Sequence, residues 1–185
     1  MFFSSISSLA PEMQAATQVA AGVLPFFNSG KTVLLGREFR ERYNLHCWME
    51  FGGKREDNES LAETACREAN EETAQSLSIT LQQVQQAEQK GHYLDHYNEK
   101  TGVFYRMYCL LLGGYQVSPA VFQENAQHNE NVEKMGWQYF PARDVIYSPD
   151  GSLPGVEDKL YNTMMVRLEK LKEQEFFQRD YLPNM

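Results

Sequence analysis

Residues 53–75 read GKREDNESLAETACREANEETAQ, and they are the most informative part of the sequence. From Leu61 to Ala69, small apolar residues recur at every fourth position, which is the spacing of one face of a helix. Ser60 and Glu63 form an S-x-x-E capping box, in which each side chain accepts a hydrogen bond from a backbone amide at the helix start. The stretch therefore predicts a loop that runs from a glycine into an amphipathic helix.

The acidic residues of this helix form a second pattern. Successive helical residues lie about 100° apart around the axis, so Glu68, Glu71 and Glu72 fall within one arc of about that width. Such like-charge neighbours cost a few tenths of a kcal/mol per pair on an exposed helix. A hard divalent cation would offset this cost, because Mg²⁺ takes oxygen ligands, and Arg67 is placed to orient a carboxylate. The other interpretation is a solvated acidic face.

The spacing of the whole stretch distinguishes these interpretations. Gly53 is followed after five residues by Glu59, and after seven more by Arg67–Glu72. This pattern resembles the Nudix box, G-x5-E-x7-R-E-U-x-E-E-x-G-U, and Phe51–Lys54 resembles its usual lead-in. The chain is thus identified as a member of the Nudix hydrolase family.

The resemblance assigns an architectural role to Arg67 and Glu59, as an ion pair that fixes the loop against the helix. Two positions depart from the pattern. Ala74 stands where the family has glycine, and Gln75 where it has an aliphatic residue. If position 74 is left-handed, alanine costs about 1 kcal/mol there; otherwise the helix end is extended or reshaped.

The resemblance also implies a metal site and a reaction. Glu68, Glu71 and Glu72 would bind Mg²⁺ or Mn²⁺ with help from the Gly52 carbonyl, and Glu68 would take a proton from the attacking water. We therefore expect a metal-dependent hydrolase that cleaves a pyrophosphate linkage in a nucleoside diphosphate joined to another moiety: a nucleotide, a nucleotide sugar or a dinucleotide. The alternative is a Nudix-fold sensor module that binds a nucleotide without cutting it.

Two acidic residues outside the helix are further candidates for the site. Many Nudix enzymes use an acidic residue on a loop ahead of a Trp-containing strand, and here Glu130 and Glu133 precede Trp137. We assign Glu133 to catalysis as a metal ligand or general base, with Glu130 as the alternative. The remaining interpretation is a solvated loop in which neither residue acts. The substrate-binding residues stay unassigned.

Aromatic residues supply a weaker signal for the base of a nucleotide. Tyr93, Tyr97 and Tyr105 have rings on which a base would stack, but tyrosines in strands more often pack in the core. Packing is the favoured interpretation for each of the three.

The remaining elements fit the same family. Strands are expected at residues 18–27, 32–35, 48–51, 102–112 and 137–140, a strand or loop at 81–90, and a closing helix at 156–177. The fold implied is a Nudix-type α/β/α sandwich around a mixed β-sheet. A single Nudix domain would span residues 1–185, with residues 1–15 as an N-terminal extension.

The composition limits the classes of molecule that this chain is expected to bind. The chain has 185 residues, a formal charge of −8 and a pI near 5.0, which disfavours binding to duplex nucleic acid. It contains no apolar run long enough for a membrane span and no signal-like N-terminus. We expect a cytoplasmic protein that acts on a small nucleotide pyrophosphate, and a homodimer is compatible with the sequence.

Overall fold

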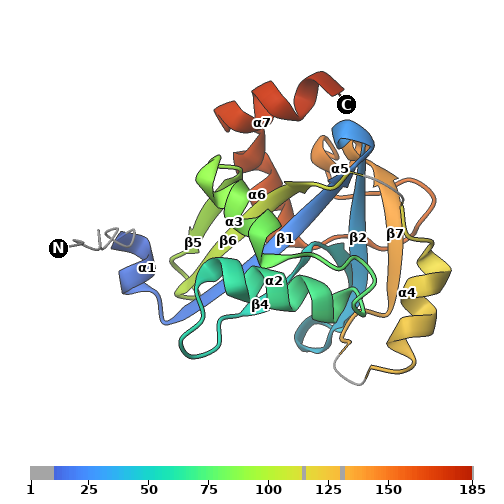
Figure 1. The fold of residues 1–185 in the computed structure, drawn as a ribbon, viewed down its shortest axis with the longest axis horizontal. Coiled ribbons are helices and arrows are strands. Elements are labelled where there is room, and N and C mark those ends of the chain that lie inside the picture. The colour runs from blue at the N-terminus through green and yellow to red at the C-terminus, as the bar shows by residue number, and fades with distance from the viewer. Residues whose placement is uncertain (1–10, 114–115, 130–131, 185) are drawn as a thin grey trace.

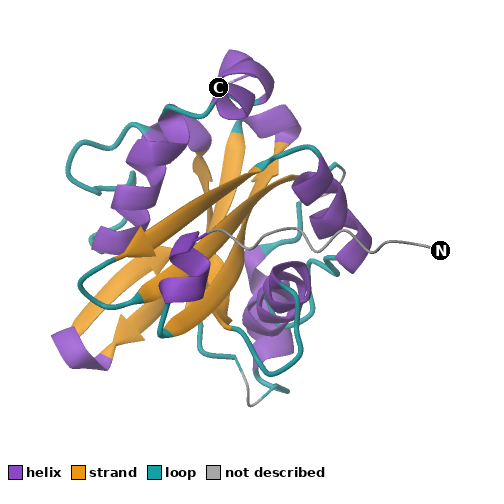
Figure 2. Ribbon diagram, turned by 90° about the vertical axis from the view of Figure 1, so that its left-hand side faces the viewer, coloured by secondary structure: helices purple, strands orange, loops and turns teal. Residues whose placement is uncertain are grey.

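The computed structural model describes residues 11–113, 116–129 and 132–184. Figures 1 and 2 show a curled β-sheet between two layers of helices. The strands are β1 (Gln18–Phe27), β2 (Thr32–Arg40), β3 (Leu45–Met49), β4 (Phe51–Lys54), β5 (Tyr93–Asn98), β6 (Val103–Leu111), β7 (Gly136–Pro141) and β8 (Lys159–Leu160). The helices are α1 (Pro11–Ala15), α2 (Leu61–Glu72), α3 (Leu81–Gln89), α4 (Pro119–Ala126), α5 (Ala142–Ile146), α6 (Asn162–Lys172) and α7 (Glu175–Asp180), with 3₁₀ turns η1 (Asn28–Gly30), η2 (Glu41–Tyr43) and η3 (Leu182–Asn184).

Strand β1 is the centre of the sheet. It pairs with β6 in parallel and with β2 and β4 in antiparallel orientation, and the strand order is β5-β6-β1-β2-β3-β8. Every residue of β1 from Ala20 to Phe27 is buried, as expected for a strand that is covered on both faces. The expected mixed sheet is confirmed, and β1 positions β4, which leads into the segment 53–75.

Two apolar cores hold the helices on the sheet. On one face, Ala65 and Val84 of α2 and α3 pack with Phe51 and Phe104. On the other face, α5, α6 and α7 contribute to a core that contains Phe26 and is separate from the first. The expected α/β/α arrangement is therefore confirmed. In the described part of the chain, no helix is long and apolar enough to cross a membrane.

The strand expected at residues 48–51 is two strands, broken at Glu50. Strand β3 pairs with β2, whereas β4 pairs with β1, so the chain changes partners at this residue. The Glu50 side chain is fully buried and forms an ion pair with Arg167 of α6. The alternation of apolar and polar residues did not reveal the break, because the polar residue Glu50 is buried in an ion pair and does not face solvent.

The segment 81–90 was expected to be a strand or loop, and this is wrong because it forms helix α3. Thr80 and Gln83 form a second capping box, with each backbone amide bonded to the other side chain. Val84 and Ala87 are buried three residues apart, and glutamine is a good helix former. Helical capping and propensity together account for the helix.

The expected helix at 156–177 is wrong at its start and is interrupted near its end. Before α6, the chain forms β8, which pairs in parallel with β3, and the Asp158 carboxylate lies 2.6 Å from Arg37 Nε. These contacts keep the chain out of the helix, and Lys159, Leu160 and Tyr161 are extended. The predicted apolar spacing holds within α6, where Met164 and Leu168 are buried, and a separate helix, α7, follows.

Candidate active site

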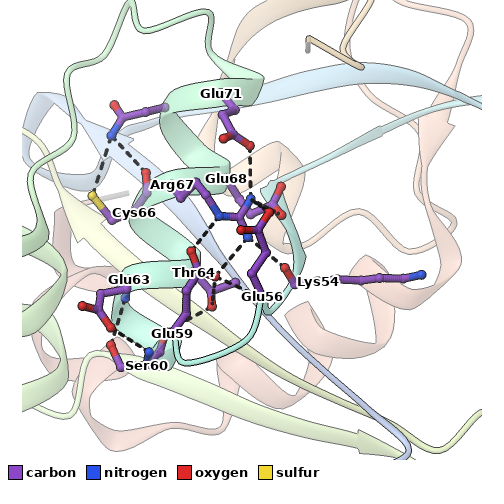
Figure 3. Close-up of polar contacts among 11 residues, drawn as sticks. Lys54, Glu56, Glu59, Ser60, Glu63, Thr64, Cys66, Arg67, Glu68 and Glu71 are labelled. Carbon is purple, nitrogen blue, oxygen red and sulfur yellow. Dashed lines mark hydrogen bonds and ion pairs between the residues drawn. The ribbon is translucent and has the colours of Figure 1, made fainter.

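The segment 53–75 folds as a loop and helix fixed at both ends of the loop. At the start of α2, the Ser60 hydroxyl accepts a hydrogen bond from the Glu63 amide at 3.2 Å, and the Glu63 carboxylate accepts one from the Ser60 amide at 2.7 Å. The predicted capping box is therefore confirmed, as Figure 3 shows.

Arg67 ties the loop to the helix. Its Nε and Nη2 donate to the two oxygens of Glu59 at 2.7 and 3.1 Å, and Nη2 also donates to the Lys54 carbonyl at 2.9 Å (Figure 3). The hydrogen bonds from Arg67 lower the pKa of Glu59 to about 2. The expected pair is present, and its two parallel bonds make it geometrically specific.

The third nitrogen of the same guanidinium reaches the acidic face. Arg67 Nη1 lies 2.9 Å from Glu68 Oε1 and 3.1 Å from Glu71 Oε2. The Glu68 carboxylate also packs against Gly53, where an added Cβ would stand 2.6 Å from its carboxyl atoms. Glycine suits position 53 because the Glu68 carboxylate approaches the backbone so closely that a Cβ would collide with it.

Glu72 points to the interior. Its Oε2 accepts a hydrogen bond from the Gly52 amide at 2.7 Å, and its Oε1 lies 3.3 Å from Lys134 Nζ. Burial raises the pKa of Glu72 to about 7, although Lys134 and the Gly52 amide act in the opposite direction. The backbone at Glu72 is held as well, because Trp137 Nε1 donates to its carbonyl at 2.9 Å.

Lys134 is a buried cation that the sequence analysis missed. Its ammonium lies 2.5 Å from Glu38 Oε2, and its side chain is 1% exposed. Burial lowers the pKa of Lys134, but the carboxylates of Glu72 and Glu38 raise it above its usual value, so the ammonium stays charged. The stem passes Gly36, where a Cβ would lie 2.7 Å from Lys134 Cδ. Nothing local in the sequence marks this lysine as buried.

The three helix carboxylates have two separate sets of partners. Arg67 holds Glu68 and Glu71, while Lys134 and Gly52 hold Glu72. Among the described residues, no three Asp, Glu, His or Cys side chains are gathered as a ready metal site. The donors nevertheless suit a hard divalent cation, because all are oxygens and because Glu68 and Glu72 both rest against the Gly52-Gly53 turn.

The turn at the end of α2 keeps the left-handed conformation despite its departures from the box. Ala74 and Gln75 have φ angles of 50° and 59°. The helix ends at Glu72 and is not extended. Each left-handed residue without glycine costs about 1 to 2 kcal/mol, so the family's turn is preserved here at some cost in stability.

A cavity of about 820 Å³ opens beside these residues, a size typical of small-molecule sites. Gly52, Glu68 and Glu72 line it, and so does Glu133, whose side chain is exposed. Glu130 lies outside the described residues. Glu71 is not among the residues that line this cavity in the described part of the chain.

The three tyrosines considered for base stacking have different surroundings. Tyr105 lines the cavity but is only 9% exposed. Tyr93 lies under the guanidinium of Arg106, 4.0 Å from its ring centroid, and Tyr97 packs against the apolar core on the α2 side of the sheet. Packing is thus the main role of these rings.

The fold and the loop–helix define an α/β protein of the Nudix class of pyrophosphohydrolases. The family model described as NUDIX domain matches residues 16–162. The chain therefore belongs to the Nudix family. No curated protein matches the chain in sequence.

Solved structures resemble the chain in fold. An Ap4A hydrolase of C. elegans in a binary complex matches with a TM-score of 0.52 and 19% identity, over 84% of this chain and 96% of that one. A NUDIX hydrolase from Nitrosomonas europaea has a TM-score of 0.50 and 16% identity, over 85% and 71%. A bifunctional NMN adenylyltransferase/ADP ribose pyrophosphatase from Francisella tularensis, complexed with AMP and Mn ion, has a TM-score of 0.52 and 14% identity, over 84% and 41%.

The Glu59–Arg67 pair predicts a particular pH dependence of stability. Because the pKa of Glu59 is lowered from 4.5 to about 2, the pair stabilises the fold above about pH 4.5, and this contribution is lost as the pH falls toward 2. The free energy of unfolding of Glu59→Gln, measured by denaturant titration, should decline less than that of the wild type across this window. Glu173→Gln, at an exposed carboxylate, is the control. Parallel curves for Glu59→Gln and the wild type would contradict the assignment.

Lys134→Met should destabilise the protein by about 3 to 5 kcal/mol, because it removes one partner of a buried ion pair. Glu38 keeps its ion pair with Arg40, whereas Glu72 is left with the Gly52 amide. Adding Glu72→Gln should recover part of the loss. Lys172→Met, which removes a pair with the exposed Glu169, should change stability by less than about 0.5 kcal/mol. Urea unfolding measures the wild type and these three variants, and a loss below about 1 kcal/mol for Lys134→Met would refute this role.

Proposed function

We propose that the protein is a divalent-metal-dependent hydrolase that cleaves a pyrophosphate linkage in a nucleoside diphosphate joined to another moiety. The observation that carries this proposal is that Glu68 and Glu72, from one helix, line the same cavity as the Gly52-Gly53 turn. The names of the similar structures support the substrate class, since one is an Ap4A hydrolase and another an ADP ribose pyrophosphatase.

The residues that would hold Mg²⁺ or Mn²⁺ are Glu68, Glu71 and Glu72, with the Gly52 carbonyl. When bound, such an ion neutralises phosphate charge and lowers the pKa of a bound water. Arg67 contacts Glu68 and Glu71 through Nη1, whereas Nε and Nη2 bind Glu59. The carboxylates can therefore exchange Nη1 for another cation while the loop stays fixed by the other two nitrogens.

Basic residues make the cavity able to accept phosphates in an acidic protein. Arg40, Arg42, Lys54 and Arg167 all line it, although the chain as a whole has a charge of −8. Cations placed near the carboxylates attract and orient a polyanion. In this proposal, Glu68 accepts a proton from the attacking water at its carboxylate, and Glu133, which lines the same cavity, assists as a metal ligand or general base.

One observation favours the second candidate, a nucleotide sensor without activity. Every carboxylate of the α2 acidic face already has a cationic partner, Arg67 or Lys134. A protein that only binds nucleotide would need no further cation at these residues. The two candidates differ in turnover, so hydrolysis of a panel of nucleotide pyrophosphates distinguishes them.

The proposal predicts metal-dependent turnover through Glu68. Activity on the best substrate of the panel should be lost in EDTA and return with excess Mg²⁺ or Mn²⁺. Glu68→Gln should lower kcat by about 100-fold, equivalent to about 2.7 kcal/mol of transition-state stabilisation. Glu63→Gln, in the first turn of the same helix, is the matched control and should keep wild-type kcat. Full turnover in metal-free buffer would refute the metal role, and saturable binding without turnover would favour the sensor.

Glu133 is tested separately because it comes from a different segment. Glu133→Gln should lower kcat by at least about tenfold, or about 1.4 kcal/mol, while the thermal stability of this exposed position stays unchanged. Glu124→Gln, at an exposed carboxylate of α4, is the control. If Glu130→Gln lowers kcat and Glu133→Gln does not, the role belongs to Glu130.

A further inference from the structure

Two tyrosine rings stand together on the wall of the cavity that contains Glu68. Tyr43 comes from turn η2 and Tyr161 from the residue before α6, and both line this cavity. Their ring centroids are 6.3 Å apart with an angle of 46° between the planes. Segments far apart in the sequence thus supply a pair of aromatic faces in the cavity that holds the acidic residues.

Tyr161 is the fixed member of the pair. Its amide donates to the Trp48 carbonyl at 3.0 Å, and the Arg40 guanidinium carbon lies 5.1 Å from its ring centroid. Arg40 is itself held by an ion pair with Glu38 and by a contact to Met49 Sδ at 2.9 Å. These contacts keep the Tyr161 ring in one orientation.

Tyr43 is the accessible member. The residue is 57% exposed, and its turn ends at Asn44 in a left-handed conformation with φ 47°. The guanidinium carbon of Arg42 lies 5.5 Å from the Tyr43 ring centroid. Little of this ring is buried, so rotating it outward exposes little additional apolar surface. The rotation breaks the ring contact and the hydroxyl hydrogen bond with Tyr161.

We propose that Tyr43 and Tyr161 bind the base of the substrate, with Arg42 meeting a phosphate beside it. The inference rests on the proposed function, because it places the base in the cavity where the pyrophosphate would be cut. For a planar base to stack between two rings, the centroids of those two rings must lie about 7 Å apart, which is twice the usual contact distance. The centroids of Tyr43 and Tyr161 are 6.3 Å apart, so the Tyr43 ring must rotate outward to admit a base. Stacking accepts any base, and the pair therefore selects nucleotides over sugar phosphates without choosing a particular base.

Binding in EDTA tests this inference independently of hydrolysis. The probes are AMP, GMP and ribose 5-phosphate, which share a phosphate and a ribose but differ in the base. Calorimetric titration of the wild type should give a lower Kd for AMP and GMP than for ribose 5-phosphate. Tyr43→Leu should raise the Kd of AMP and of GMP by about tenfold, and should leave that of ribose 5-phosphate unchanged.

Two variants serve as controls. Tyr43→Phe keeps the aromatic face and should restore most of the affinity that Tyr43→Leu loses. Tyr147 is a similarly exposed tyrosine, at 48%, with a lysine ammonium 5.5 Å from its ring, and it does not line this cavity among the described residues. Tyr147→Leu should therefore leave every Kd unchanged.

The outcomes separate this inference from the proposed function. A Tyr43-dependent preference for AMP in a protein that hydrolyses no pyrophosphate would support the base site and refute the hydrolase. Turnover with Kd and KM values that Tyr43→Leu does not change would refute the base site and leave the hydrolase. Equal losses for AMP and ribose 5-phosphate, or a wild type that binds both equally, would also refute it.

Discussion

The buried carboxylate of Glu72 is the constraint around which the site is built. A charge that leaves water must be paired and hydrogen-bonded, or it becomes strongly destabilising. Here the Gly52 amide and the Lys134 ammonium contact its two oxygens at 2.7 and 3.3 Å. The partners come from β4 and from the segment before β7, so this carboxylate connects α2 to two other parts of the fold. Gly36 on β2 completes the arrangement by leaving room for the lysine stem.

The acidic side chains of α2 differ in how deeply they are placed, and their partners differ accordingly. The exposed fractions of the side chains are 35% for Glu71, 16% for Glu68 and 7% for Glu72. The outer two share one nitrogen of Arg67, in a position that solvent reaches, whereas the inner one contacts a lysine that is 1% exposed. Outer contacts of this kind are weak and exchangeable. The inner contact is costly to break, because it leaves a charge without a partner.

The sequence predicts well those features that depend on residues close together in the chain. The capping box joins residues three apart and the Glu59–Arg67 pair joins residues eight apart, so both follow from spacing along one loop and helix. The strands at 18–27 and 137–140 follow from composition for a similar reason. The break at Glu50 has a different origin, because its cause is Arg167 from a segment far along the chain. Lys134 likewise has the local sequence of a surface lysine, and distant partners bury it.

The errors in the helices have the same physical origin. In 81–90, the many glutamines obscured the spacing of three between the apolar residues Val84 and Ala87. The capping box at Thr80 starts the helix that buries both of them. In 156–177, pairing of β8 with β3 overrides the helical pattern until Tyr161. Intrinsic preferences are small, usually below about 1 kcal/mol per residue, so strand pairing and buried contacts can reverse them.

The acidic and aromatic parts of the cavity are linked through one residue. Arg40 lies over the ring of Tyr161 and pairs with Glu38, and Glu38 in turn holds the ammonium that contacts Glu72. A change at Tyr161 therefore also disturbs the charge balance beneath the acidic face. Tyr43 contacts Tyr161 through its ring and its hydroxyl, and Arg42 lies over its ring, but none of these contacts is an ion pair. Loss of the Tyr43 ring thus removes an aromatic face while the buried ion pairs remain, and its effect on binding reports on ring recognition rather than on the integrity of the site.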